Sequence, residues 1–257
     1  FRQRWMDIYE NQGKRSGAYS AGCRTHPFLL LNHTDDLNSE FTLAHELGHA
    51  MHSYLSNRHQ PPVYADYVLF VAEVASTCNE ALLMYHLLGK TEDRKKRAVL
   101  INYFLEQFRT TVYRQTMFAE FELETHRLAE AGETLTAARL CEIYSGLNRL
   151  YYGEDVAQDE EIAMEWGRIP HFYRRFYVYQ YATGFSAAMA LSRRILEGGP
   201  EAAADYLQFL RGGSSADPLT LLKGAGVDLS TPKPVEDALA LFGQLTEEME
   251  GLVDAAR

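Results

Sequence analysis

The feature that most constrains this chain is the spacing of its apolar residues, which recur every three or four positions from about residue 38 onwards. This is the period of an α-helix with one buried face. Proline, which ends or kinks helices, accounts for only 8 of the 257 residues, so long helices are permitted. The sequence therefore predicts a mainly α-helical fold. The helices that we expect lie at 38–60, 66–88, 92–131, 136–151, 172–196, 200–210 and 234–253.

The segment 1–37 lacks this period and predicts a small strand-and-loop element in front of the first helix. Turn-forming residues fill 11–17, and the apolar run Pro27–Leu31 has the length of a short strand. We expect one or two strands here, followed by a helical domain at 38–257 that begins with Asn38 or Ser39 as its N-cap.

The charge and hydropathy of the chain exclude several classes of protein. With 25 Lys and Arg against 35 Asp and Glu, the net charge is −10, which disfavours nucleic-acid binding because phosphate contacts need clustered basic side chains. The longest apolar run has six residues, whereas a membrane-spanning helix needs about 20. We expect neither a nucleic-acid partner nor a membrane partner.

The cysteines and the first residues bear on location and completeness. Three cysteines, an odd and sparse set, favour a reducing compartment, so we expect a cytoplasmic protein. The chain begins at Phe1, with neither an initiator Met nor an export signal. We therefore expect a fragment of a longer protein, whose missing N-terminal portion would be its partner.

His45, Glu46 and His49 form the pattern HExxH inside the first expected helix. The i, i+4 spacing places both imidazoles on one helix face, about one turn apart, where they can share a zinc ion. Gly48 stands between them although glycine weakens a helix by about 1 kcal/mol relative to alanine, which indicates that another group approaches closely there. The pattern predicts a site for one Zn²⁺ per chain.

A catalytic zinc has three protein ligands and leaves a fourth position to water, so a third ligand is needed. His52 lies about 10 Å along the helix from His45, too far to join the same ion. Glu73 is the better candidate, because it stands alone in an apolar stretch where a carboxylate without a cation is costly. Glu80, on the same helix face as Glu73, is either a hydrogen-bond acceptor for a ligand imidazole or an ordinary surface glutamate.

Glu46 is expected to act as the general base. Zinc lowers the pKa of its bound water towards about 7, and a carboxylate within hydrogen-bond reach can take the proton as the water attacks a carbonyl.

Four stretches of the chain resemble one known family. Thr42–His52, Phe70–Thr77, Gly13–Ser20 and Gly213–Leu219 are similar to the oligoendopeptidase F branch of the thimet-oligopeptidase-like zinc metallopeptidases. The resemblance covers nearly the whole chain and implies a C-terminal catalytic portion with a zincin-like, mostly helical fold and its site in a deep cleft.

The resemblance also implies roles for single residues. It makes His45, His49 and Glu73 the zinc ligands and Glu46 the general base. It places a histidine and several tyrosines on a late helix that faces the zinc.

The stretch that matches this late helix is Ile169–Tyr181, which makes His171, Tyr177 and Tyr181 candidate catalytic residues. The two tyrosines are i, i+4 and would share a helix face, so either hydroxyl can donate to a developing oxyanion. The first tyrosine of thimet oligopeptidase would fall one position earlier, on Phe176, so the sequence leaves open which tyrosine donates. The alternative is an aromatic core stripe.

Together these features predict a zinc-dependent endopeptidase that hydrolyses short, unstructured oligopeptides with broad sequence tolerance. The strand at 27–31 is the one expected to pair with the substrate backbone. One alternative is a zinc-bound helical protein without peptidase activity, whose site a fourth protein ligand closes. The other is a helical scaffold in which HExxH is accidental and binds no metal.

Overall fold

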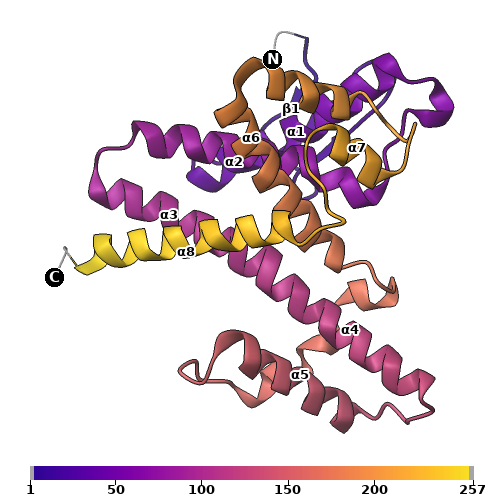
Figure 1. The fold of residues 1–257 in the computed structure, drawn as a ribbon, viewed down its shortest axis with the longest axis vertical. Coiled ribbons are helices and arrows are strands. Elements are labelled where there is room, and N and C mark those ends of the chain that lie inside the picture. Colours follow the sequence, from indigo (N-terminus) through magenta and orange to yellow (C-terminus); the bar gives the residue numbers. More distant parts are fainter. Residues whose placement is uncertain (1–2, 255–257) are drawn as a thin grey trace. The chain divides into compact units, whose positions relative to one another are not determined.

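The computed structural model of the chain describes residues 3–254, and helices dominate it (Figure 1), which confirms the predicted fold class. The chain divides into two compact units. The larger unit consists of the chain up to Leu105 and from Gly184 onwards, and the smaller unit is Glu106–Thr183. None of the described helices is long and apolar enough to cross a membrane.

The larger unit begins with a small sheet of three strands, β1 (Met6–Asp7), β2 (Tyr19–Ala21) and β3 (Phe28–Leu30). Their order is β1-β3-β2, with β1 parallel and β2 antiparallel to β3. We expected one or two strands, and the sheet has three. We also expected a substrate to pair with β3. That pairing prediction is wrong, because β3 is the central strand and both of its edges are occupied by neighbouring strands.

The first two helices of the larger unit follow the sheet. Helix α1 (Leu37–His59) is capped by Asp36, whose carboxylate accepts the N–H of Ser39 at 2.7 Å, so the N-cap lies two residues before the expected Asn38. The helix ends before Pro61 as predicted. Helix α2 (Ala72–Lys90) begins later than the expected residue 66, because the 3₁₀ turns η1 (Pro62–Tyr64) and η2 (Leu69–Val71) fill the connection.

Four further helices belong wholly or mainly to the larger unit: α3 (Arg94–Phe108), α6 (Tyr179–Leu210), α7 (Pro218–Gly224) and α8 (Lys233–Asp254). Arg97 of α3 pairs with Glu248 of α8. Helix α6 is broken at Gly199, where φ is +63°, next to Pro200, which matches the predicted boundary between two helices. The sequence did not predict α7.

The loop that follows α6 fixes the connection between α1 and α2. Gly213 has φ of +54°, and a Cβ there would lie 2.0 Å from the carbonyl oxygen of Tyr64. The N–H of Ser214 donates to the same oxygen at 2.9 Å, and Nε2 of Gln60 donates to the carbonyl of Arg211 at 2.8 Å. The close approach requires a residue without a side chain at position 213.

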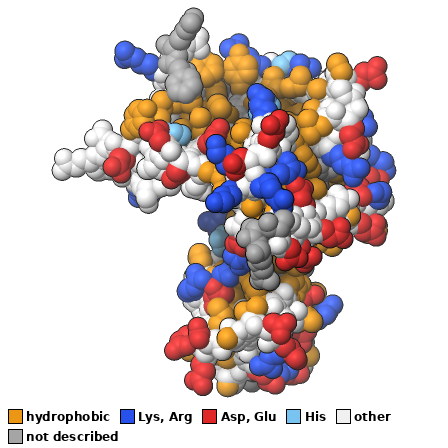
Figure 2. Space-filling view, turned by 90° about the vertical axis from the view of Figure 1, so that its left-hand side faces the viewer, with side chains coloured by type: hydrophobic (Ala, Val, Ile, Leu, Met, Phe, Trp, Pro, Cys, Tyr) orange, Lys and Arg blue, Asp and Glu red, His pale blue; other side chains and the backbone are white. Residues whose placement is uncertain are grey.

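The smaller unit contains a π-helical turn, two α-helices and two 3₁₀ helices among its described residues: η3 (Arg109–Tyr113), α4 (Arg114–Glu130), α5 (Ala137–Tyr152), η4 (Glu160–Arg168) and η5 (Pro170–Tyr173). The expected helix at 92–131 is therefore interrupted by the π turn. The core of this unit packs α4 and α5 against the segment 169–178 through Met117, Phe118, Phe121, Tyr144, Ile169 and Val178. On the face drawn in Figure 2, acidic and basic side chains are interspersed.

Candidate metal centre and catalytic residues

The metal centre is built on the close packing of α1 against α2. A Cβ on Gly48 would lie 2.5 Å from the carbonyl oxygen of Ala75 and 2.5 Å from Cα of Ser76, so only glycine lets the two backbones come this near. The side-chain amide of Asn79 donates to the carbonyl of Ala44 at 3.1 Å and joins the same two helices. The prediction that another group approaches Gly48 closely is confirmed.

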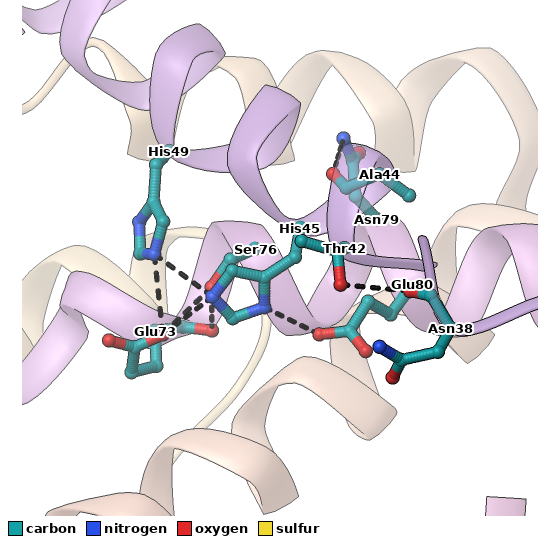
Figure 3. A network of polar contacts seen from close by, with 9 residues as sticks. All are labelled: Asn38, Thr42, Ala44, His45, His49, Glu73, Ser76, Asn79 and Glu80. Carbon is teal, nitrogen blue, oxygen red and sulfur yellow. Dashed lines mark hydrogen bonds and ion pairs between the residues drawn. The ribbon is translucent and has the colours of Figure 1, made fainter. Parts of the chain in front are cut away.

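The two helices bring His45, His49 and Glu73 together (Figure 3). Nε2 of His45 lies 3.2 Å from Nε2 of His49 and 3.3 Å from Oε2 of Glu73, and Nε2 of His49 lies 3.4 Å from the same oxygen. Within the described part of the chain, no other group of His, Cys, Asp and Glu side chains converges in this way.

These distances match the coordination that zinc prefers. Bonds of about 2.0–2.2 Å in a tetrahedral site place the ligand atoms about 3.3–3.6 Å apart, and the three separations observed are 3.2, 3.3 and 3.4 Å. Nδ1 of His45 lies 2.6 Å from Oε1 of Glu80. A proton held on Nδ1 by that carboxylate leaves a lone pair on Nε2 for a metal. Of the two alternatives for Glu80, the structure therefore favours the hydrogen-bond acceptor over the surface glutamate.

The charged groups of the centre shift one another's pKa values. Burial lowers the pKa of His45, but the carboxylates of Glu73 and Glu80 outweigh this and raise it to about 10. Burial acts to raise the pKa of Glu73, yet the hydrogen bonds with His45 and His49 hold it well below its usual range. The hydroxyl of Ser76 also donates to Glu73, at 3.1 Å. The site is thus prepared for a cation, which would replace the proton of His45.

Glu46 lies on α1 with only 6% of its surface exposed. Its Oε2 is buried and has no hydrogen-bond partner among the described residues. Burial raises the pKa of its carboxyl, and His45 and His49 oppose this increase. A carboxylate whose pKa is moved towards neutrality by its surroundings is suited to accept a proton.

His52 lies outside the ligand group, in accordance with its distance along α1. Its ring is buried and stacks on Tyr67, with ring centroids 3.6 Å apart. Burial lowers its pKa to about 3, so it is a neutral core residue.

His171, Tyr177 and Tyr181 lie together in the smaller unit. The rings of His171 and Tyr177 are stacked with centroids 5.7 Å apart, and the hydroxyl of Tyr181 lies 3.3 Å from Nε2 of His171. The expected helix at 172–196 begins only at Tyr179, so Tyr177 precedes it and the i, i+4 reasoning is wrong. The rings of the two tyrosines nevertheless contact each other, with centroids 5.6 Å apart.

The structure adds Glu122, which sequence analysis missed. This side chain of α4 is 3% exposed and accepts the backbone N–H of Phe176, the residue before Tyr177. The signal that identified Glu73, a lone carboxylate in an apolar stretch, is absent here, because Glu120 and Glu124 stand two residues away on either side.

Comparison with known proteins agrees with the chemistry that the geometry of His45, His49 and Glu73 indicates. The sequence profile of peptidase family M3 matches residues 1–241. The chain belongs to this family. The resemblance to the oligoendopeptidase F branch of the thimet-oligopeptidase-like metallopeptidases, which the motifs indicated, is confirmed by this match and by the relatives below.

The names of similar proteins indicate which branch of family M3 this chain resembles. Oligopeptidase PepF of Bacillus subtilis (strain 168) is 53% identical over 251 residues, which are 97% of this chain and 38% of PepF. An oligoendopeptidase F homolog of Lactococcus lactis subsp. lactis is 48% identical over 255 residues, 99% of this chain and 42% of that protein. The crystal structure of oligoendopeptidase-F from Enterococcus faecium superposes with a TM-score of 0.77 at 45% identity, covering 85% of this chain and 40% of that one. The chain thus spans about two fifths of the length of these M3 relatives.

Proposed function

We propose that this chain is the catalytic portion of a zinc-dependent endopeptidase that hydrolyses short, unstructured oligopeptides. The observation that carries the proposal is the tetrahedral spacing of His45, His49 and Glu73. Membership of family M3 and the names of the relatives, an oligopeptidase and two oligoendopeptidases, support it.

In this proposal each residue of the site has one role in peptide hydrolysis. Zinc, when bound, polarises the scissile carbonyl and makes a water acidic enough to attack near neutral pH. His45, His49 and Glu73 hold the ion, and Glu80 keeps His45 in the tautomer that can bind it. Glu46 takes the proton of the attacking water and returns it to the leaving amine.

We assign His171, Tyr177 and Tyr181 to hydrogen bonding of the substrate carbonyl as negative charge develops on its oxygen. The assignment is supported by the resemblance to the oligoendopeptidase F branch and by the mutual contacts of the three rings within the smaller unit.

We also propose that the longer protein encloses its site in a channel, which a peptide of roughly ten residues can enter and a folded protein cannot. The chain spans only about two fifths of its relatives, so the remaining portion would be its partner in forming that channel. Cys23, Cys78 and Cys141 are all free thiols, which favours a cytoplasmic protein.

The test is Glu46→Gln in the full-length protein. An amide keeps the size of the side chain but cannot accept the proton, so zinc content should be unchanged while cleavage of a quenched peptide falls at least ~10²-fold. Glu40→Gln, an exposed change on the same helix, should cleave like the wild type. Near-wild-type turnover of Glu46→Gln would contradict the role of Glu46.

The same measurements separate the alternatives. A wild type that contains zinc but cleaves no peptide would indicate a zinc-bound protein without peptidase activity. A wild type that binds no metal would indicate that the HExxH pattern is accidental.

A further inference from the structure

Phe176 adopts a backbone conformation that is unfavourable for a residue with a bulky side chain. Its φ is +55°, in the left-handed region, and it lies directly before Tyr177. Side chains crowd the backbone in this region, so such residues persist only where their surroundings hold them.

Glu122 supplies the backbone contact that holds Phe176. Its carboxylate accepts the N–H of Phe176 from within α4, and the side chain is almost completely buried. Burial raises the pKa of the Glu122 carboxyl, and the bond from Phe176 opposes this increase. A buried carboxylate is costly unless it is hydrogen-bonded, so the glutamate and the N–H of Phe176 each satisfy the other.

His126, one turn after Glu122 on α4, adds a contact to the side chain of Phe176. The two ring centroids are 4.8 Å apart, and Nδ1 of His126 lies 2.8 Å from the carbonyl oxygen of Glu122. The same turn of α4 therefore contacts both the backbone and the ring of Phe176.

The conformation of Phe176 sets the direction of the residues that follow it. Val178 is 1% exposed and lies in the core of the smaller unit, which fixes the chain on the far side of Tyr177. Tyr177 is thus held between a left-handed residue and a buried one, with its ring stacked on His171. If Phe176 returned to an ordinary negative φ, Tyr177 would leave this position.

A different carboxylate holds the helix η4, which precedes His171 in the chain. Glu165 accepts hydrogen bonds from Arg114, Arg168 and the hydroxyl of Tyr144. A change at Glu122 should therefore displace Tyr177 and leave the segment before His171 in place.

We propose that Glu122 is a positioning residue, which accepts the N–H of Phe176 and thereby holds the left-handed turn that sets Tyr177 against His171. The consequence for catalysis rests on the proposed function, because that proposal assigns Tyr177 to the reaction.

The first test compares kcat and KM of the zinc-loaded full-length protein on a quenched peptide. Glu122→Leu has similar volume but no acceptor, so kcat should fall about 10-fold or more while KM changes less than about threefold, since a donor to developing charge acts mainly in the transition state. Glu122→Gln keeps an acceptor oxygen and should recover most of the kcat. Glu130→Gln, exposed on the same helix, should match the wild type.

The second test needs no activity. Arg174 and Arg175 are exposed, and trypsin cleaves after them only where the chain locally opens. Glu122→Leu should be cut there at least about fivefold faster than the wild type, Glu122→Gln or Glu130→Gln, with zinc content unchanged. Phe176→Pro removes the N–H and fixes φ near about −65°, so with Glu122 intact it should reproduce the fall in kcat and the faster cleavage after Arg174. Only the bond after Arg174 is compared in this variant, because trypsin does not cleave an Arg–Pro bond. It replaces Glu122→Leu if that variant does not fold.

The outcomes that overturn the proposal are distinct. Unchanged tryptic cleavage in Glu122→Leu would show that Glu122 does not hold the turn. Faster cleavage with unchanged kcat, or a loss of zinc and of kcat in parallel with melting temperature, would show that the turn has only a structural role. If the wild type cleaves no peptide, the proposed function fails, and the trypsin comparison still decides whether Glu122 holds the turn.

Discussion

Helices α1 and α2, which carry the proposed zinc ligands, and the segment 169–181 both fix side chains of the proposed site, but they do so by different physical means. His45 and His49 stand one turn apart on a regular α-helix, so backbone hydrogen bonds within α1 set their spacing. His171 lies in the 3₁₀ turn η5, and Tyr177 lies between that turn and α6. Its position depends on a left-handed residue and on a carboxylate that comes from another helix.

The difference predicts how each region responds to substitution. The spacing of the two histidines is local and should change little when distant residues are altered. The segment 169–181, called the aromatic segment below, depends on contacts with α4 and α5 and should respond to changes far along the sequence.

The largest effect is expected for Glu73→Ala, which should abolish zinc binding at neutral pH because it removes one of three ligands. Glu80→Ala should weaken binding only about 10- to 100-fold, since it removes the group that orients His45. His52→Ala should keep its zinc. The metal content of the purified variants after dialysis is the measurement, and equal retention by the Glu73 and Glu80 variants would contradict the ligand assignment.

The aromatic segment offers the corresponding test with Tyr177→Phe and Tyr181→Phe. Removing the hydroxyl that donates to the carbonyl oxygen should lower kcat about 10²-fold with little change in KM. We expect the larger loss for Tyr177→Phe, because the hydroxyl of Tyr181 is engaged with His171. Tyr173→Phe, at a position that is 89% exposed, is the control. Full activity of both variants would contradict a catalytic role and would indicate that the two tyrosines only pack in an aromatic core stripe.

Gly48→Ala tests how closely the two ligand helices must pack. The new Cβ would meet backbone atoms of Ala75 and Ser76 at 2.5 Å, so α1 and α2 would have to separate. We expect a loss of about 2–3 kcal/mol in the free energy of unfolding and weaker zinc binding, despite the better helix propensity of alanine.

Gly243→Ala is the matched control for Gly48→Ala, since α8 leaves open space around it. It should stabilise the protein by about 0.5–1 kcal/mol. Denaturant unfolding measures both changes, and equal effects would show that Gly48 is not needed for close packing.

The smallest effect concerns acid stability and Glu165. Burial acts to raise the pKa of its carboxyl, but the hydrogen bonds from Tyr144 and Arg114 outweigh this and lower it. A lowered pKa means that Glu165 stabilises the fold above its unfolded value of about 4.3 and loses this contribution as the pH falls through the folded value. Glu165→Gln resembles the protonated form, so its melting temperature should approach that of the wild type as the pH falls from 7 to 3. A constant difference would contradict the assignment.

The same contrast explains how much the sequence could predict. The spacing of His45 and His49 follows from one helical period, and the lone carboxylate Glu73 could be recognised from its apolar neighbours. The start of α2 could not, because the 3₁₀ turns before it depend on contacts with the loop around Gly213. Nor could the start of α6, because the left-handed Phe176 interrupts an apolar period that by itself predicts a helix.

The small sheet shows another limit of sequence patterns. The strand at 28–30 was recognisable from its apolar run, but its central place was not. Its central place depends on Met6 and Asp7, which pair with Leu29 and Leu30. Two residues are too few to show a recognisable strand pattern in the sequence.

The loop around Gly213 gives the chain a constraint that concerns evolution rather than chemistry. No atom of this loop belongs to the ligand group, yet any side chain at position 213 would collide with the carbonyl of Tyr64 and strain the backbone. A saturation library selected for activity should therefore tolerate almost no replacement there, as if it were a catalytic position. Residues outside the proposed ligand group can be as intolerant of change as the ligands, when they hold the connection between the two helices that carry those ligands.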